Sequence, residues 1–359
     1  MDRPSTASDK QEGTSGAEPS QRSAGTLQRR RLQLHWPPER DFRILAIDGG
    51  GIRGILPAAV LSELETQYLG GQSIGRYFDL IVGTSTGGII SLGLGSGMTA
   101  RELRDLYLTR GQEIFPPAKH FRTVTRSLRG LLMPRFEQAA LRKVLTDTLG
   151  NRILGDSTNR LCIPSCDGRY GDVYIFKTAH HPDYKKDWRE AMIDIAIATA
   201  AAPTYFKPYA KGGYRFVDGG LWANNPVMIG LVDALACFDV DRHRIRILSL
   251  GCVPGQFHVN WLKQNLGGLI AWRDAVFGSM DLQSLNVDGQ AGLLIGRERL
   301  VRIDADPISP AIDLDNFARA RDELPPLALQ LVAKFGEQVR EHFLKTPVVP
   351  YDRFQPAPA

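Results

Sequence analysis

A stretch near residue 85 has the residue types and spacing of a serine nucleophile. GTSTGG at residues 83 to 88 matches glycine-x-serine-x-glycine, the nucleophile elbow, with Ser85 between Gly83 and Gly87. The apolar run before it predicts a strand, and the apolar run after it predicts a helix. On such an elbow the serine lies in strained backbone at the tip of a strand, and the flanking glycines avoid steric collision. We therefore predict Ser85 as a nucleophile; the alternative is a glycine-rich loop without chemistry.

A second stretch could supply the base that a serine needs. DGGLWANNP at 218 to 226 places Asp218 directly before Gly219 and Gly220. Taken alone, this pattern is also compatible with a tight turn in which the aspartate bonds locally. A serine hydroxyl, however, requires a base within hydrogen-bond reach, and the loops at the carboxyl ends of parallel strands converge. Asp218 is the candidate for that base.

The sequence leaves two schemes for the base open. In the α/β-hydrolase scheme a later histidine completes a triad with Ser85 and Asp218, and the histidines in the required order are His243, His258 and His342. Each of the three is also compatible with an ordinary surface position. In the second scheme Asp218 accepts the serine proton directly. A carboxylate with a reference pKa of about 3.9 is a weak base, so burial would have to raise that pKa.

A glycine-rich turn offers hydrogen-bond donors for an anion. LAIDGGGIRG at 45 to 54 formally matches the dinucleotide fingerprint between a strand and a helix, but no acidic residue follows about 20 positions later. Consecutive glycine amides at a helix N-terminus still form an anion cradle. We predict an oxyanion hole made by Gly49, Gly50, Gly51, Arg53 and Gly54. A non-catalytic nucleotide- or phosphate-binding turn is the alternative.

The alternation of short apolar runs with longer amphipathic ones predicts an α/β fold with a mostly parallel sheet covered on both faces by helices. The expected strands cover 43–47, 78–83, 173–176, 214–220 and 244–251, and the expected helices cover 55–70, 87–95, 137–149 and 188–203. Thr99 and Glu102 have the spacing of a capping box, which predicts a further helix to about Gly111.

Composition bounds the class of protein. The chain has 359 residues, of which 43% are hydrophobic and 23% charged, and its net charge is +5. This excess of basic residues is too scattered to indicate DNA or RNA binding. The cysteines at 162, 166, 237 and 252 lack zinc-site spacing and are expected to be free thiols. Without an apolar run of about 18 residues or a secretory signal, we expect a cytoplasmic protein.

Two segments outside the predicted elements have distinctive compositions. Residues 1–40 are rich in Ser, Gly, Gln and Arg and are expected to form a flexible tail. In RSLRGLLMPRF, at 126 to 136, Leu131, Leu132 and Met133 follow two arginines. This basic and apolar segment could insert into a bilayer surface, or it could be a loop that packs on the core.

The motifs DGGGIRG, GTSTGG and DGG, in this order and spacing, resemble those of the patatin-like lipid acyl hydrolases. The resemblance covers about residues 41–252, which makes this the expected catalytic domain, with 253–359 as a helical extension packed on it. It implies a three-layer α/β/α fold and a dyad of Ser85 and Asp218 beside an oxyanion hole. It also implies cleavage of fatty acyl esters of membrane phospholipids, without metal or cofactor.

A narrower resemblance concerns three further stretches. RFEQAALRKVLTDTLGNRILGDS, FKTAHH and ATAAAPTYFKPY are similar to the patatin-like effectors of bacterial cyclic-oligonucleotide (CBASS) anti-phage systems. This resemblance implies activation by a cyclic di- or trinucleotide, antiviral defence, and action at the inner face of the cell membrane. Formation of a homo-oligomer on ligand binding is one route by which a resting state could be released. A constitutive lipid esterase without nucleotide gating is the alternative.

Overall fold

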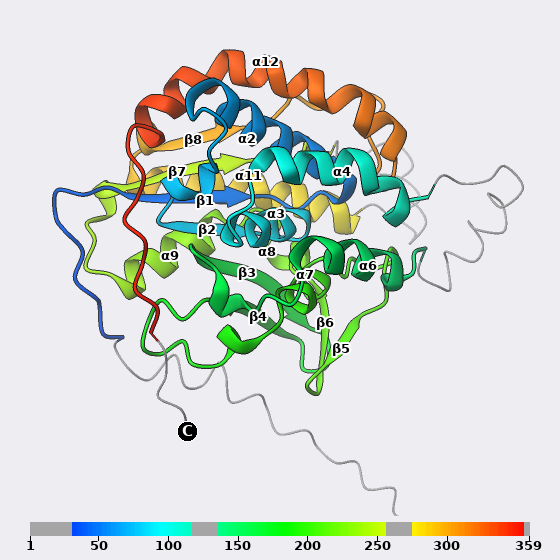
Figure 1. Ribbon diagram of the computed structural model, residues 1–359, viewed down its shortest axis with the longest axis horizontal. Coiled ribbons are helices and arrows are strands. Elements are labelled where there is room, and N and C mark those ends of the chain that lie inside the picture. Colours follow the sequence, from blue (N-terminus) through cyan, green and yellow to red (C-terminus); the bar gives the residue numbers. More distant parts are fainter. Residues whose placement is uncertain (1–30, 117–134, 256–274, 355–359) are drawn as a thin grey trace, which may run out of the picture. The chain divides into compact units, whose positions relative to one another are not determined.

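The computed structural model describes residues 31–116, 135–255 and 275–354. Within this part of the chain, eight strands form one mixed sheet in the order β5-β6-β3-β2-β1-β7-β8, with β4 also paired to β3 (Figure 1). The strands are β1 (Phe42–Ile47), β2 (Leu80–Gly83), β3 (Arg160–Asp167), β4 (Asp172–Lys177), β5 (Tyr209–Lys211), β6 (Tyr214–Asp218), β7 (Ile245–Leu250) and β8 (Leu300–Ile303). The strands from β3 to β8 along this order are parallel, whereas β4, β5 and β6 are antiparallel to their neighbours.

The central strand β1 packs against helices on both faces because its successive side chains point to opposite sides. Leu45 and Ile47 belong to one apolar core, and Ile44 and Ala46 belong to the other. All four side chains are fully buried. This run without polar residues is typical of a parallel strand covered on both faces, which is the α/β fold with a mostly parallel sheet that the sequence predicts.

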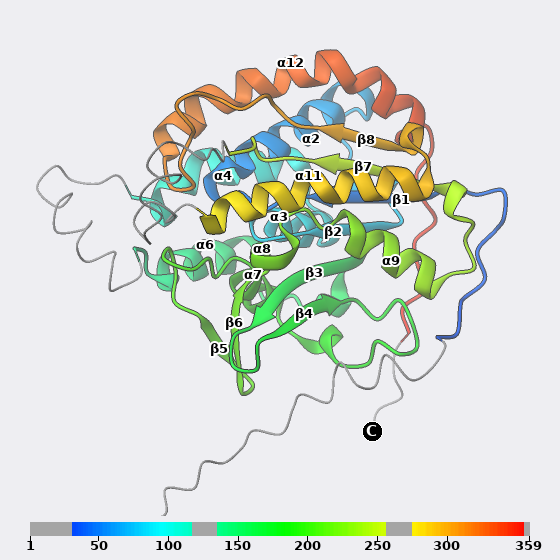
Figure 2. The same cartoon turned by 180° about the vertical axis from the view of Figure 1, so that it is seen from behind.

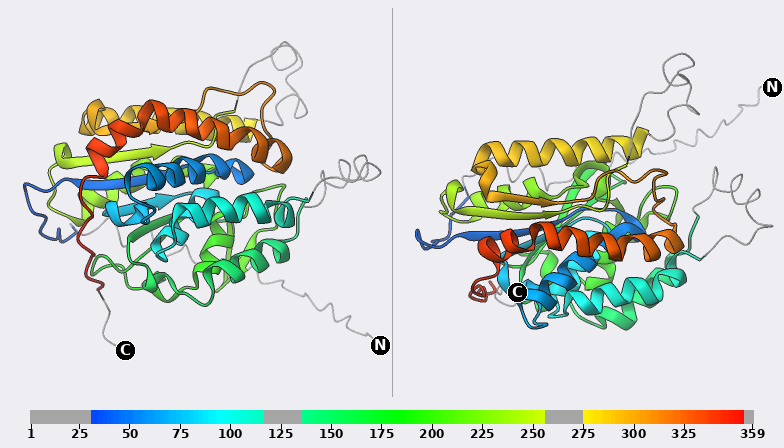
Figure 3. Two further views of the ribbon diagram at one scale, coloured as in Figure 1. Left: turned by 45° about the horizontal axis from the view of Figure 1, so that its top comes forward. Right: turned by 90° about the horizontal axis from the view of Figure 1, so that it is seen from above.

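The helices form the outer layers of the fold. One layer contains α2 (Ile55–Tyr68), α3 (Thr86–Gly95), α4 (Ala100–Ile114), α6 (Gln138–Leu149), α7 (Met192–Thr199) and α12 (Phe317–Phe343). The other contains α9 (Val227–Cys237) and α11 (Ala275–Ile295), with the short α8 (Gly220–Ala223) in contact with α11 (Figure 2). Figure 3 shows the sheet between α11 and α12.

Local sequence features set several helix boundaries. The capping box at the start of α4 is present, with Thr99 accepting from the Glu102 amide and Glu102 accepting from the Thr99 amide. Gly150 follows α6 with a positive φ of 60°. The helix predicted over 188–203 is shorter, Met192–Thr199: Asp187–Arg189 forms a separate 3-10 turn before it, and the helix ends four residues before Pro203.

Three features differ from the expectations. Strands β3 and β5 were not predicted. Residues 31–40, expected within a flexible tail, pack on the fold instead: Trp36 is 5% exposed, and its ring makes a tilted contact with Phe42 and an edge-to-face contact with Phe238. Beyond residue 252 the chain supplies β8 to the sheet as well as helices, so the extension is not purely helical.

Candidate functional site

Ser85 lies at a sharp turn between β2 and α3. Its φ of 55° is left-handed, a strained conformation for a residue with a side chain. A Cβ on Gly83 would collide with the Gly87 carbonyl, and a Cβ on Gly87 would collide with the Ile47 carbonyl. The strand-to-helix turn of a nucleophile elbow is therefore present, and both flanking glycines are required for its packing.

Asp218 reaches Ser85 because β2 and β6 share one edge of β3. Cys162 pairs with β2 on one side and with β4 on the other, whereas Ser165 pairs with β4 and with Asp218. The parallel strand β2 thus covers the beginning of this edge, and the antiparallel strand β6 returns along its end. The carboxyl ends of the two strands meet head to head beside Pro164.

The Ser85 and Asp218 side chains are in direct contact. Ser85 Oγ donates to Asp218 Oδ2 at 2.7 Å, and the Gly220 amide donates to Asp218 Oδ1, also at 2.7 Å. Asp218 is only 3% exposed. Burial raises the pKa of Asp218 to about 6, although the bonds from Gly220 and Ser85 act in the opposite direction. The carboxylate is thereby a stronger base than an exposed aspartate.

The end of α7 holds both members of this pair, which sequence reasoning did not identify. Thr199 Oγ1 accepts from the Ser85 amide at 3.0 Å and donates to the Pro164 carbonyl at 2.6 Å. The amide of Asp218 donates to the Ala201 carbonyl at 3.1 Å. The small residues of TAAAP, at 199–203, allow this close approach, and that alanine run was the available indication.

The glycine-rich turn lies beside the pair. Gly49 approaches Ser85 and Asn224 so closely that a Cβ would lie 3.4 Å from Ser85 Cβ. The amides of Gly49 and Ile52 are bonded to the carbonyls of Asn224 and Leu314. The described residues, by contrast, offer no acceptor to the amides of Gly50 and Gly51. These two amides are the donors that the turn has available for an oxyanion.

The other residues predicted for this turn have different positions. Arg53 donates to the Val253 carbonyl at 2.8 Å and so fastens the turn to the segment after β7. Gly54 faces Thr86, where a Cβ would collide. Gly219 packs against the Pro164 carbonyl, and Gly220 supplies the amide that bonds Asp218.

A network of ion pairs holds Asp48, the residue directly before the glycine-rich turn. Asp48, 3% exposed, precedes the glycines and accepts two bonds from Arg302 on β8, at 3.1 and 2.7 Å. Arg302 also bonds Asp304 at 2.7 Å and lies 3.4 Å from Asp288 on α11. Burial alone would lower the pKa of Arg302, but the carboxylates, Asp48 first, raise it well above its ordinary value.

Helix α11 also contacts the loop after Asp218. Asn224 Nδ2 donates to Ser284 Oγ at 3.1 Å, and Asn225 Nδ2 donates to Asp288 Oδ1 at 3.0 Å. Gln283 both accepts from the Asn225 amide and donates to its carbonyl. The C-terminal extension is thus bonded to both loops of the site.

The histidines proposed for a triad lie elsewhere. His243 is exposed in the turn before β7, and His342 is on α12; His258 lies outside the described residues. Within the described chain, Ser85 Oγ and the Asp218 carboxylate bond no histidine. The predicted insertion segment Leu131–Met133 also lies outside the described residues.

A second buried cluster surrounds Asp233 on α9. Its carboxylate accepts from Lys177 Nζ and Tyr184 OH, each at 2.6 Å, and lies 2.7 Å from His180 Nε2. Possible metal-ligand atoms of Cys162, His180 and Asp233 lie within 4.8 Å of one another. However, Lys177 and His180 lower the pKa of Asp233 against the effect of burial, and the ammonium already neutralises the carboxylate. This is an ion-pair network and does not fit a cation. All four cysteines are free thiols.

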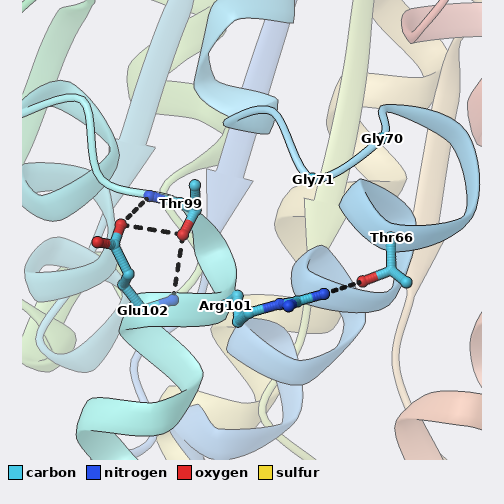
Figure 4. A pocket seen from close by; sticks show the side chains of 6 residues that line it. All are labelled: Thr66, Gly70, Gly71, Thr99, Arg101 and Glu102. Atoms are coloured by element: carbon cyan, nitrogen blue, oxygen red, sulfur yellow. Dashed lines mark hydrogen bonds between the residues drawn. The ribbon is translucent and has the colours of Figure 1, made fainter.

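A surface hollow of about 420 Å³ is lined by residues from α2, α4 and the turn after α2, including Thr66, Gly71 and Arg101 (Figure 4). Neither Ser85 nor Asp218 lines it. The adjacent amides of Ala100 and Arg101, at the start of α4, are already bonded by the Glu65 carboxylate. The hollow therefore has no built anion site. Separately, no helix of the described chain is both long and apolar enough to cross a membrane.

Comparison with known proteins adds three relatives and a family model. Residues 45–231 match the model of the patatin-like phospholipases. A "cGAMP-activated phospholipase" of Pseudomonas aeruginosa is 32% identical over 88% of this chain and 91% of its own length. One of Escherichia coli is 38% identical over 61% of this chain, but the match spans only 64% of that relative. "Patatin-like protein 2" of Arabidopsis thaliana is 35% identical over 78% of this chain and 82% of its own length.

Two solved structures are also similar. VipD of Legionella pneumophila aligns with 82% of this chain and 67% of its own, with a TM-score of 0.40 at 12% identity. ExoU of Pseudomonas aeruginosa, in complex with SpcU, gives a TM-score of 0.34 at 13% identity over 83% of this chain and 53% of the matched chain.

Proposed function

The chain belongs to the patatin-like phospholipase family, and from this premise we propose that it hydrolyses fatty acyl esters of membrane phospholipids through a dyad of Ser85 and Asp218. The observation that carries the proposal is the 2.7 Å contact between Ser85 Oγ and Asp218 Oδ2 inside the protein. A buried carboxylate of raised pKa supplies the base, and the amides of Gly50 and Gly51 supply the oxyanion donors.

The first half of the reaction forms an acyl-enzyme. Asp218 takes the proton of the Ser85 hydroxyl as its oxygen attacks the ester carbonyl carbon. The tetrahedral oxyanion is stabilised by the free amides of the glycine-rich turn, and one such donor is worth about 3 kcal/mol in the transition state. When the ester C–O bond breaks, Asp218 returns the proton to the leaving lysophospholipid oxygen.

The second half releases the fatty acid. A water molecule attacks the acyl carbon and gives one proton to Asp218, and the same amides stabilise the second oxyanion. The acyl–serine bond then breaks, and Asp218 returns the proton to Ser85 Oγ. The Thr199 bond to the Ser85 amide keeps the strained elbow in place throughout.

We also propose that a cyclic nucleotide activates the enzyme in antiviral defence. The relatives from Pseudomonas aeruginosa and Escherichia coli, 32% and 38% identical to this chain, are named cGAMP-activated phospholipases, which favours cGAMP as the activator. The ligand must bind the active state more tightly than the resting state, whether that state is a different conformation or a different oligomer. Action at the inner face of the cell membrane follows from such a role.

Substitution of the dyad tests the chemistry. We expect Ser85→Ala and Asp218→Asn each to lower hydrolysis of a soluble short-chain ester at least about a thousandfold. His243→Ala and His342→Ala should leave it within about twofold, since neither side chain reaches the dyad. Circular dichroism of each variant checks that the fold is intact. Full activity of a folded Ser85→Ala protein would rule out Ser85 as the nucleophile, whereas no ester hydrolysis by the unmodified protein would leave only a binding function for the glycine-rich turn.

A titration tests the gating separately. Fatty acid release from vesicles is followed while cGAMP, cyclic di-AMP or cyclic di-GMP is added to the full chain. Activity that rises only with cGAMP supports activation by that nucleotide. Equal, high activity at every concentration would instead indicate a constitutive lipid esterase.

A further inference from the structure

Helices α9 and α11 form a surface without exposed charge. The charged residues within them are Asp233, Asp281 and Asp288. Asp233 bonds Lys177 and His180, Asp288 bonds Asn225, and Asp281 lies against the Gly255 backbone. All three therefore point into the fold. In the described part of both helices, no ionisable side chain points to solvent.

The same surface presents large aliphatic side chains. Leu282, Leu285 and Leu293 on α11 are 54%, 68% and 76% exposed, Val232 on α9 is 55% exposed, and Leu221 on α8 is 41% exposed. The leucines of α11 recur at helical spacing with Gly289, next to which a Cβ would meet open space. We call these five exposed residues the apolar face; its helices lie together in Figure 2.

The opposite layer has an ordinary surface for comparison. Along α12, Arg321, Glu337 and Arg340 are exposed and form ion pairs with neighbouring residues. A chain with 23% charged residues can thus supply charges to a solvated helix, and it does so on α12. The apolar face is consequently a local feature. Large apolar side chains exposed together on adjacent helices mark interaction sites.

Arginines border the apolar face at one end of α11. The turn before β7 and the turn before β8 lie at the same end of the sheet, and both contact α11. These turns hold four arginines and His243, opposed by Asp241 and Glu298; the arginines are Arg242, Arg244, Arg297 and Arg299. An apolar surface beside a basic border complements anionic headgroups over acyl chains.

The apolar face extends to the candidate site. Leu221 is three residues from Asp218, and Met280 at the other end of α11 packs against Gly220. We propose that the apolar face is the surface with which the protein docks on an anionic phospholipid bilayer. The inference rests on the proposed function only in that the substrate is a membrane lipid. Docking here brings the catalytic edge of the sheet to the lipid surface.

Vesicle flotation tests the proposal independently of catalysis. The protein carries Ser85→Ala, and the vesicles contain phosphatidylglycerol and phosphatidylethanolamine, with and without cGAMP. We expect Leu282→Gln, Leu285→Gln and Leu293→Gln together to lower vesicle binding by on the order of tenfold or more, because each leucine would otherwise be buried in lipid. Because a Ser85→Ala chain hydrolyses nothing, failure of binding is distinct from failure of the proposed chemistry.

The matched control changes three aliphatic residues of similar exposure elsewhere. Val173→Gln, Leu329→Gln and Val349→Gln alter side chains that are 60%, 51% and 66% exposed, and should leave binding unchanged. Arg242→Gln with Arg297→Gln should weaken binding to anionic vesicles only, and less so in high salt.

Three results would overturn the proposal. The first is that the Ser85→Ala protein with an otherwise unchanged surface binds no vesicles, with or without cGAMP. The second is equal binding by the leucine variant and its control. The third is a leucine variant that changes the oligomeric state in sedimentation velocity while vesicle binding is unaltered, since the apolar face would then cover a second copy of the chain.

Discussion

At the scale of the residue, the proposed mechanism depends on the basicity of Asp218. The carboxylate is almost fully buried, and within the described part of the chain its hydrogen-bond donors are Ser85 and Gly220. Burial without a cationic partner raises its pKa and so makes the carboxylate a better proton acceptor. Ionisation of this buried carboxylate destabilises the native state: the loss of stability develops as the pH rises from about 4, the pKa of an exposed aspartate, to about 6, and is complete above that value.

This raised pKa predicts the pH dependence of the reaction. We expect kcat/KM for a soluble ester to fall about tenfold per unit as the pH drops below about 6, because protonated Asp218 cannot accept the serine proton. The profile is measured over about pH 4.5 to 8, with the fold checked by circular dichroism at each end. A rate that stays constant down to about pH 4.5 would contradict a base with this pKa.

At the scale of the element, β8 and α11 position both loops of the site. Arg302 on β8 holds Asp48 below the glycine-rich turn, and α11 bonds the loop that follows Asp218. The charged side chains of β8 and α11 do not contact the side chains of Ser85 or Asp218 in the described structure. The hydrogen bonds of these two elements hold the loops whose backbone amides are the proposed oxyanion donors.

Replacing Arg302 tests this support. We expect Arg302→Met to lower the free energy of unfolding by about 3 kcal/mol, because Asp48 is left as a buried unpaired charge. It should also lower kcat by about tenfold or more with little change in KM, since the displaced turn stabilises the transition state. Urea unfolding and ester kinetics measure the two effects.

Two companion variants separate positioning from general damage. Arg302→Lys keeps a cation and should recover part of kcat, and adding Asp48→Asn to Arg302→Met should recover stability but not activity. Arg302→Met with unchanged kcat and stability would show that the network has no such role.

The motifs could be predicted from the sequence because their geometry is local. The elbow around Ser85 needs small residues at fixed offsets, and the capping box of Thr99 and Glu102 spans one helical turn. Strand β3 could not be predicted in the same way, because Pro164 interrupts the apolar pattern of its sequence and its two edges pair with three partner strands. Thr199 and Arg302 act over 114 and 254 residues of chain, and no local pattern indicates such contacts.

At the scale of the whole molecule, the described residues that follow the family match pack into the same unit as the matched residues. That match ends at residue 231, and the catalytic domain expected from sequence ends at 252. Nevertheless β8 extends the sheet, and α12 covers α2 with buried residues such as Leu324, Val339 and Phe343.

We therefore expect a chain truncated after Gly255 not to fold alone. Removal of the later residues would expose the cores on both faces of the sheet, since α11 belongs to one and α12 to the other. Far-ultraviolet circular dichroism during thermal unfolding and light scattering are the measurements. A monomeric truncated chain with a cooperative transition would show that the extension is dispensable for folding.

Helix α11 connects the exposed surface to the two loops of the candidate site through few hydrogen bonds and ion pairs. Its Ser284 is one hydrogen bond from Asn224, whose carbonyl receives the amide of Gly49. Its Asp288 forms an ion pair with Arg302, which in turn donates to Asp48. A displacement of α11 by a partner bound to its exposed leucines would therefore reach both loops of the site. In each case two bonded contacts connect the helix to the backbone of the glycine-rich turn.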